Sequence, residues 1–215
     1  MLDALTLSTY IAVVIALMLV PGPAVLLLLT RTAQGGQRVG LATGAGIALG
    51  DFIHTLVAAA GLSTLLMTST IAFSVVKYLG AAWLVYLGVR ALKAPAQSET
   101  PQIPPPEASK HRGISPTLAF WQAVPAEVLN PKTALFFLAF LPQFVHTQRG
   151  HVLAQFLQLG LVFVVLSLAY TSLLVLATRP LARVVRRLGG LERWQNRLVG
   201  SLFLGLGIKV ALQKQ

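Results

Sequence analysis

The sequence predicts an all-α, polytopic membrane protein of about six transmembrane helices, on three grounds: composition, charge placement and long apolar segments. Of the 215 residues, 55% are hydrophobic and only 11% are charged, and the mean hydropathy is +0.74. A chain this apolar cannot cover a soluble domain with polar side chains. The charged residues also gather between the apolar segments, which is the pattern that a lipid bilayer imposes on a sequence.

Six apolar segments approach the length of about 20 residues that a transmembrane helix needs. They are residues 5–29, 41–63, 68–92, 115–142, 152–178 and 197–213, of which the last is short. The first segment lacks a basic start and a small-residue cleavage site, so it is expected to be a retained span. Prolines and polar residues fill residues 94–114, which predicts an extended linker. We therefore expect two units of three spans, residues 1–93 and 115–215, joined by this linker.

Most of the 17 lysines and arginines fall in the connectors after the first, third and fifth spans. Their positions are Arg31, Arg38, Arg90, Lys93, Lys110, Arg112, Arg179, Arg183, Arg186, Arg187, Arg193 and Arg197. Because basic connectors stay in the cytoplasm, both termini are expected on the periplasmic side of a bacterial inner membrane. The 179–197 loop is expected to lie against anionic lipid headgroups, with a surface amphipathic helix as the alternative.

Composition argues against several classes of protein. The net charge of +11 needs no nucleic acid to explain it, because the basic residues lie between spans and not on a soluble domain. The chain has no cysteine, and its histidines, His54, His111, His146 and His151, are scattered. Neither a membrane enzyme nor a metal site is therefore expected, and no cofactor is predicted. The oligomeric state stays open, with a homodimer as one option.

Two of the predicted spans contain helix-breaking motifs at corresponding places. These motifs are Pro21-Gly22-Pro23 in the first span and Asn130-Pro131-Lys132 in the fourth. Proline removes a backbone N–H, and in lipid such a break is tolerated only where it lines a cavity or is buried in protein. Two units of three spans would have opposite topology if they are repeats, as in many secondary transporters. A proline kink used for helix contact is the simpler alternative.

Asp51 lies near the middle of the second predicted span, where an ionised carboxylate costs about 2.5–3.5 kcal/mol. It should therefore face the bundle interior and have a partner or a function. His54 and Thr55 share its helical face. One interpretation makes Asp51 a ligand for a substrate ammonium group or a proton carrier; the other pairs it permanently with a lysine, such as Lys77 or Lys132.

Glu127 and Lys132 flank the second break. The sequence leaves open whether Glu127 lies in a cavity or at its mouth. Lys132 is placed to meet a substrate carboxylate or an acidic side chain. We therefore predict substrate binding by the two break motifs with Asp51, and proton coupling by Asp51, His54 and Glu127.

Four segments together resemble a known family. They are PGPAVLLLLTR (21–31), GLATGAGIALGD (40–51), KYLGAAWLVYLGVRALK (77–93) and LNPKTALFFLAFLPQFV (129–145). In these segments, and over nearly its whole length, the chain resembles the lysine-exporter (LysE/RhtB) family of translocators. The resemblance implies an inner-membrane exporter of amino acids or their derivatives, driven by the proton gradient, with the two break motifs and Asp51 as the matching positions.

Two departures from the family pattern fall at the expected cavity. Ala24 stands where the family usually has Asn, and Pro125 and Glu127 stand where it usually has Gly and neutral residues. The substrate preference of the family is therefore not carried over. The leading hypothesis is a secondary exporter that alternates access around broken spans one and four. An exporter or channel for a cation or another small solute is the alternative.

Overall fold

The computed structural model describes residues 3–68, 70–93, 114–185, 201, 204, 205 and 208. Within these ranges every regular element is a helix, as the sequence predicts. Almost all of the expected linker, residues 94–114, and most of the expected last span, 197–213, lie outside the described residues. The proposed division into two three-span units is therefore not tested by the fold.

Helix α1, Ala4–Leu19, stops at the predicted first break. The Asp3 carboxylate caps its start by accepting a hydrogen bond of 2.7 Å from the Thr6 N–H. Val20 leaves the helix with an extended backbone, and Pro23 begins α2. Proline suits this first helical position, because its missing N–H would have no helical partner there. The break expected in the first span is therefore present.

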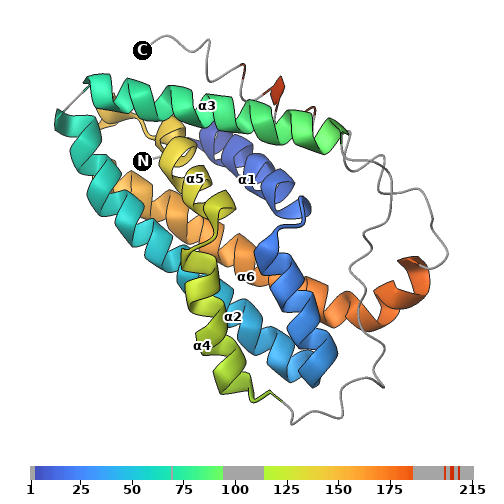
Figure 1. Ribbon diagram of the computed structural model, residues 1–215. Coiled ribbons are helices and arrows are strands. Elements are labelled where there is room, and N and C mark those ends of the chain that lie inside the picture. Colours follow the sequence, from blue (N-terminus) through green and yellow to red (C-terminus); the bar gives the residue numbers. More distant parts are fainter. Residues whose placement is uncertain are drawn as a thin grey trace.

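Helix α2, Pro23–Thr68, turns back on itself at Gly36, so that it forms two arms (Figure 1). Gly36 has φ 74° and ψ −171°, a backbone conformation that is essentially open only to glycine. The first arm completes the broken first span, and the second arm is the expected second span with Asp51. Helix α3, Thr70–Lys93, follows and matches the expected third span.

The expected fourth span is also broken. Helices α4, Pro116–Val128, and α5, Pro131–Ala139, meet at a bend of 50°. The short 3-10 turns η2, Leu141–Phe144, and η3, Thr147–Arg149, connect α5 to α6.

Helix α6, Val152–Val185, continues past the expected end at residue 178. The first part of the predicted 179–197 loop is therefore helical, which corrects that expectation. The rest of that loop, residues 186–197, lies outside the described residues.

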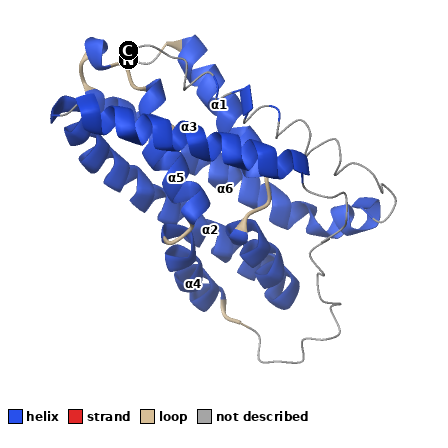
Figure 2. Ribbon diagram, turned by 45° about the horizontal axis from the view of Figure 1, so that its top comes forward, coloured by secondary structure: helices blue, strands red, loops and turns tan. Residues whose placement is uncertain are grey.

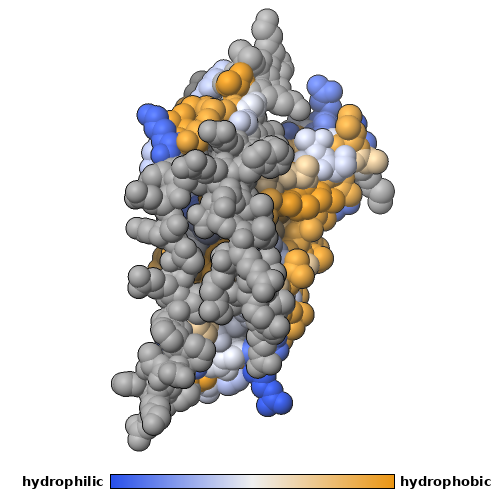
Figure 3. Space-filling model, turned by 90° about the vertical axis from the view of Figure 1, so that its right-hand side faces the viewer, coloured by the Kyte–Doolittle hydropathy of each residue, from blue (hydrophilic) through white to orange (hydrophobic). Residues whose placement is uncertain are grey.

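Apolar side chains cover the outside of the described part as well as its core. Val165 and Leu173 of α6 are 65% and 66% exposed. In Figure 3 the described surface is largely hydrophobic, with hydrophilic residues towards its two ends. The stretches Pro23–Thr64 and Val152–Thr178 are each long and apolar enough to cross a membrane, and the bent α4–α5 pair would add a third. The described residues thus form a multi-pass membrane fold.

The connectors lie at two opposite ends of the helix bundle (Figures 1 and 2). The Gly36 turn, the start of α4 and the C-terminal end of α6 lie at one end, and the α2–α3 junction lies at the other. At the latter end an ion pair of 2.9 Å joins Asp3 to Arg149. The Thr6 N–H, more than the Arg149 guanidinium, lowers the pKa of Asp3 to about 2.

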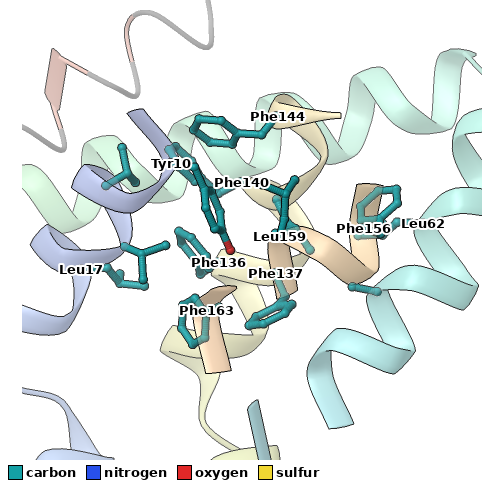
Figure 4. Close-up of a cluster of buried hydrophobic side chains, with 14 of the residues drawn as sticks. Tyr10, Leu17, Leu62, Phe136, Phe137, Phe140, Phe144, Phe156, Leu159 and Phe163 are labelled. Atoms are coloured by element: carbon teal, nitrogen blue, oxygen red, sulfur yellow. The ribbon is translucent and has the colours of Figure 1, made fainter. Parts of the chain in front are cut away.

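An aromatic cluster fills the core between the breaks and the end that carries Asp3 (Figure 4). Its aromatic members are Tyr10 from α1, Phe136 and Phe137 from α5, Phe140 between α5 and η2, Phe144 from η2, and Phe163 from α6. The ring centroids of Tyr10 and Phe144 are 5.1 Å apart, and those of Phe137 and Phe163 are 4.9 Å apart. Edge-to-face contacts at such distances add to the burial energy, so the cluster holds α1 against α5 and α6.

Small residues on the second arm of α2 allow α4 and α6 to approach closely. A Cβ atom on Gly46 would collide with the Phe120 carbonyl of α4 and lie 2.9 Å from the Ala123 Cβ. A Cβ atom on Gly44 would lie 2.9 Å from the Thr171 hydroxyl of α6. Glycine at these positions is therefore required by helix contact and not by backbone conformation.

Gly46→Ala is expected to destabilise the protein by about 1–3 kcal/mol, because the new methyl group must push the α4 backbone away. Gly61→Ala is the matched control on the same helix, since a Cβ atom there meets nothing within 4 Å. Thermal unfolding of the purified protein in detergent measures both. Equal melting temperatures for the two variants would contradict close α2–α4 contact at Gly46.

Candidate functional site

A pocket lies where the two helix breaks face each other. Its walls come from the end of α1, both arms of α2, the α4–α5 break and α6. Its volume is about 50 Å³, which is room for a few water molecules. The polar lining consists of Asp51, Glu127, Asn130, Lys132, Thr133, Ser167, Tyr170 and Thr171. The apolar lining includes Leu17, Met18, Val25, Ile47 and Phe163.

Two buried carboxyl groups meet in this pocket. Asp51 from α2 is 1% exposed and Glu127 from α4 is 2% exposed, and their carboxyl groups interact directly. The side chain of Ser167 also contacts Asp51, while Asp51 Oδ2 has no hydrogen-bond partner among the described residues. Two carboxyl groups in contact at a site of low dielectric constant can share one proton more easily than both can ionise.

Asn130 connects Glu127 to the start of α5. Its amide nitrogen donates to Glu127 Oε1 and Oε2 at 3.3 and 3.2 Å. Its side-chain oxygen accepts a hydrogen bond of 3.1 Å from the Lys132 backbone N–H. Asn130 is therefore both the N-cap of α5 and the residue that orients Glu127.

Lys132 joins the second break to the first. Its ammonium group donates to the carbonyl oxygens of Leu17, at 2.7 Å, and Val20. These carbonyls lie at the end of α1, where helical acceptors run out of helical donors; the Leu17 carbonyl also accepts a hydrogen bond of 3.2 Å from the Val20 N–H, and Val20 itself lies just past the helix. The Lys132 Cδ lies 3.2 Å from where a Cβ on Gly22 would be, so glycine leaves room for the lysine stem. The ammonium is also close enough to interact electrostatically with Glu127.

His54 contacts the backbone of Glu127 and does not line the pocket. Its Nε2 lies 3.2 Å from the Glu127 backbone carbonyl oxygen, and because a carbonyl oxygen can only accept, Nε2 is the donor. The ring stacks on Phe137, with centroids 5.6 Å apart. His54 therefore supports the backbone at the second break.

The three predicted prolines shape the breaks themselves. Pro21 lies between the end of α1 and the start of α2, Pro23 begins α2, and Pro131 begins α5. Gly22 lines the pocket between them. The structure thus brings most of the predicted site residues to one place. Among the described residues, no group of three or more His, Asp or Glu side chains is arranged to hold a metal ion.

Helix α6 contributes a polar wall to the pocket that the sequence motifs did not predict. Ser167, Tyr170 and Thr171 line the pocket, and they recur at i, i+3 and i+4 in a largely apolar stretch of α6. This spacing puts them on one helix face. A polar stripe in a predicted transmembrane helix is a signal that was available in the sequence.

The fold and the pocket together define a class of protein: a multi-pass helical membrane protein with two broken helices around buried charged groups. Residues 15–214 match the LysE type translocator family, and the chain belongs to this family. It is therefore a membrane translocator and not an enzyme.

Several relatives align with the chain over nearly their whole length. An uncharacterized membrane protein of Pseudomonas aeruginosa is 34% identical over 203 residues, which cover 94% of this chain and 93% of the relative. The leucine efflux protein of Salmonella typhimurium is 31% identical over 208 residues, with the same two coverages. The leucine efflux protein of Klebsiella pneumoniae is 30% identical over 204 residues, again with 94% and 93% coverage. No solved structure matches the chain.

Asn130→Ala is expected to lose the α5 cap, at a cost of about 1 kcal/mol, and to impair transport because Glu127 loses its orienting amide. Ser115→Ala is the matched control, because Ser115 caps α4 by accepting from the Leu118 N–H at 3.2 Å, away from the pocket. Thermal unfolding and transport in proteoliposomes measure the two effects. Similar transport by the two variants would show that Asn130 acts only as a cap.

Proposed function

We propose that this chain exports amino acids with uncharged aliphatic side chains, leucine among them, from the cytoplasm across the bacterial inner membrane in exchange for protons. The observation that carries this proposal is the buried Asp51–Glu127 pair, held between two facing helix breaks. Family membership supports the transport activity. The two leucine efflux relatives support the substrate class.

The pocket lining suits such a substrate. A zwitterion needs hydrogen-bond donors for its carboxylate and acceptors for its ammonium group, and both occur around the breaks. The apolar side chains of Met18, Val25, Ile47 and Phe163 offer a surface for an aliphatic side chain. An aliphatic group buried there gains about 0.8 kcal/mol for each CH₂.

The carboxyl pair is the proposed proton carrier. A single proton shared by Asp51 and Glu127 leaves one negative charge in the pocket, and a second proton removes it. The charge that a bound substrate meets therefore depends on proton loading, which couples the two events. His54 is proposed to assist by holding the Glu127 backbone.

Alternating access is proposed to arise from the two units, residues 1–93 and 115–215, acting as inverted repeats joined by the 94–114 linker. The breaks are the places where helices can change direction without losing many backbone hydrogen bonds. The aromatic cluster is proposed to close the pocket on the side that carries Asp3, which is the proposed periplasmic side.

Asp51→Asn is expected to reduce leucine efflux driven by a pH gradient by more than about tenfold, because the amide cannot carry the proton. Efflux from proteoliposomes, with and without the pH gradient, measures this. Asp3→Asn is the control, since Asp3 is an exposed carboxyl outside the pocket, and it is expected to transport normally. Unchanged, gradient-dependent efflux in Asp51→Asn would remove Asp51 from the coupling mechanism.

The proposed orientation can be tested directly, because the chain has no cysteine and any introduced cysteine is a unique label site. Gln34 and Gln148 are both exposed, and they lie at opposite ends of the bundle. A membrane-impermeant maleimide added to intact cells is expected to label Gln148→Cys but not Gln34→Cys. The opposite labelling pattern would invert the proposed topology.

A further inference from the structure

The carbonyl site at the end of α1 already holds a primary ammonium group, that of Lys132. The Leu17 and Val20 carbonyl oxygens both accept hydrogen bonds from it. The site lies at the negative end of the α1 dipole. The Leu17 carbonyl also accepts from the Val20 N–H, whereas the Val20 carbonyl lies past the last turn of α1. Polar donors are scarce inside a lipid-embedded fold, so the Val20 carbonyl needs a donor at all times.

Nothing in this site is specific to a lysine side chain. The two acceptors are backbone atoms, and they recognise an ammonium group with its three N–H donors. The α-ammonium group of a free amino acid has the same charge and the same number of donors. The substrate ammonium group would approach these carbonyls from the pocket, which both Leu17 and Lys132 line.

We propose that the Leu17 and Val20 carbonyl oxygens form the binding site for the substrate ammonium group, and that Lys132 occupies this site in the empty protein. The proposal rests on the proposed export of amino acids. It differs from the prediction made from the sequence, in which Lys132 meets a substrate carboxylate or an acidic side chain.

Exchange of one ammonium group for the other keeps both carbonyls satisfied. The released Lys132 has an acidic neighbour in Glu127, with which it already interacts electrostatically, and the substrate carboxylate as a further partner. Its stem passes Gly22, whose lack of a side chain leaves it room to move. Because Lys132 starts α5 and the carbonyls end α1, substrate binding would release the link between the two breaks and so favour their separation.

The test uses two fragments of leucine: 3-methylbutylamine, which keeps the ammonium group, and 4-methylpentanoate, which keeps the carboxylate. Calorimetry with the purified wild-type protein is expected to show binding of the amine and not of the acid. Lys132→Met, which keeps the apolar stem, is expected to bind the amine about tenfold more tightly, because no tethered ammonium competes. Lys93→Met is the matched control, since Lys93 is exposed at the end of α3, and it should behave as wild type.

A structure of the amine complex is expected to place the ligand nitrogen within about 3 Å of both carbonyl oxygens. This distinguishes displacement of Lys132 from a general effect of removing a positive charge. Binding of the acid by the wild type, with loss of that binding in Lys132→Met, would overturn the proposal and make Lys132 a carboxylate ligand. Unchanged or weaker amine binding by Lys132→Met would also overturn it.

If Lys132→Met does not fold, binding of the two fragments to the wild-type protein tests the proposal. Amine binding without acid binding supports the proposal, whereas the reverse, or no binding of either fragment, overturns it. Leucine efflux by wild-type proteoliposomes is measured separately. A protein that exports leucine but fails the fragment test refutes this inference alone, whereas one that exports no amino acid refutes the proposed function.

Discussion

The peptide groups released at the two helix breaks must find partners inside the protein, because the surrounding lipid offers none. The carbonyls at the end of α1 receive the Lys132 ammonium group, and the start of α5 receives the side chain of Asn130. His54 donates to the carbonyl of Glu127. These side chains make the breaks stable, and because they are polar they also make the space between the breaks a pocket.

The meeting of two acids follows from close helix contact. The Glu127 Cβ lies 2.6 Å from where a Cβ on Gly50 would be, so α4 can bring Glu127 against Asp51 only because residue 50 has no side chain. Burying both carboxyl groups opposes stability, since each loses hydration. Such a cost is typical of functional groups inside membrane helices, and it is difficult to explain by a structural role alone.

The bundle is held differently on the two sides of the pocket. Large aromatic rings join α1, α5 and α6 on one side, whereas on the other side glycines allow α2 to contact α4 and α6 closely. Lys132 joins the end of α1 to the start of α5 beside the pocket, and both of these helices belong to the aromatic side. Both sets of contacts join residues 1–93 to residues 115–185, so a rotation of the two proposed units against each other would have to change apolar contacts as well as the partners of a few polar groups.

Three features of the fold depend on local chemistry and could be predicted from the sequence. Proline placed the breaks at Pro21–Pro23 and Asn130–Pro131, apolar segment lengths placed the membrane helices, and the cost of a charge in lipid marked Asp51 as buried. The partners of the site residues became known only from the folded structure: Glu127 meets Asp51, Lys132 binds backbone carbonyls far away in the chain, and α6 completes the pocket wall with Ser167. A helix break or a membrane span is specified by residues that are neighbours in the sequence. A contact between two helices depends on the angle at which they cross and on which face each turns to the other. The residue pattern of a single segment does not specify these quantities.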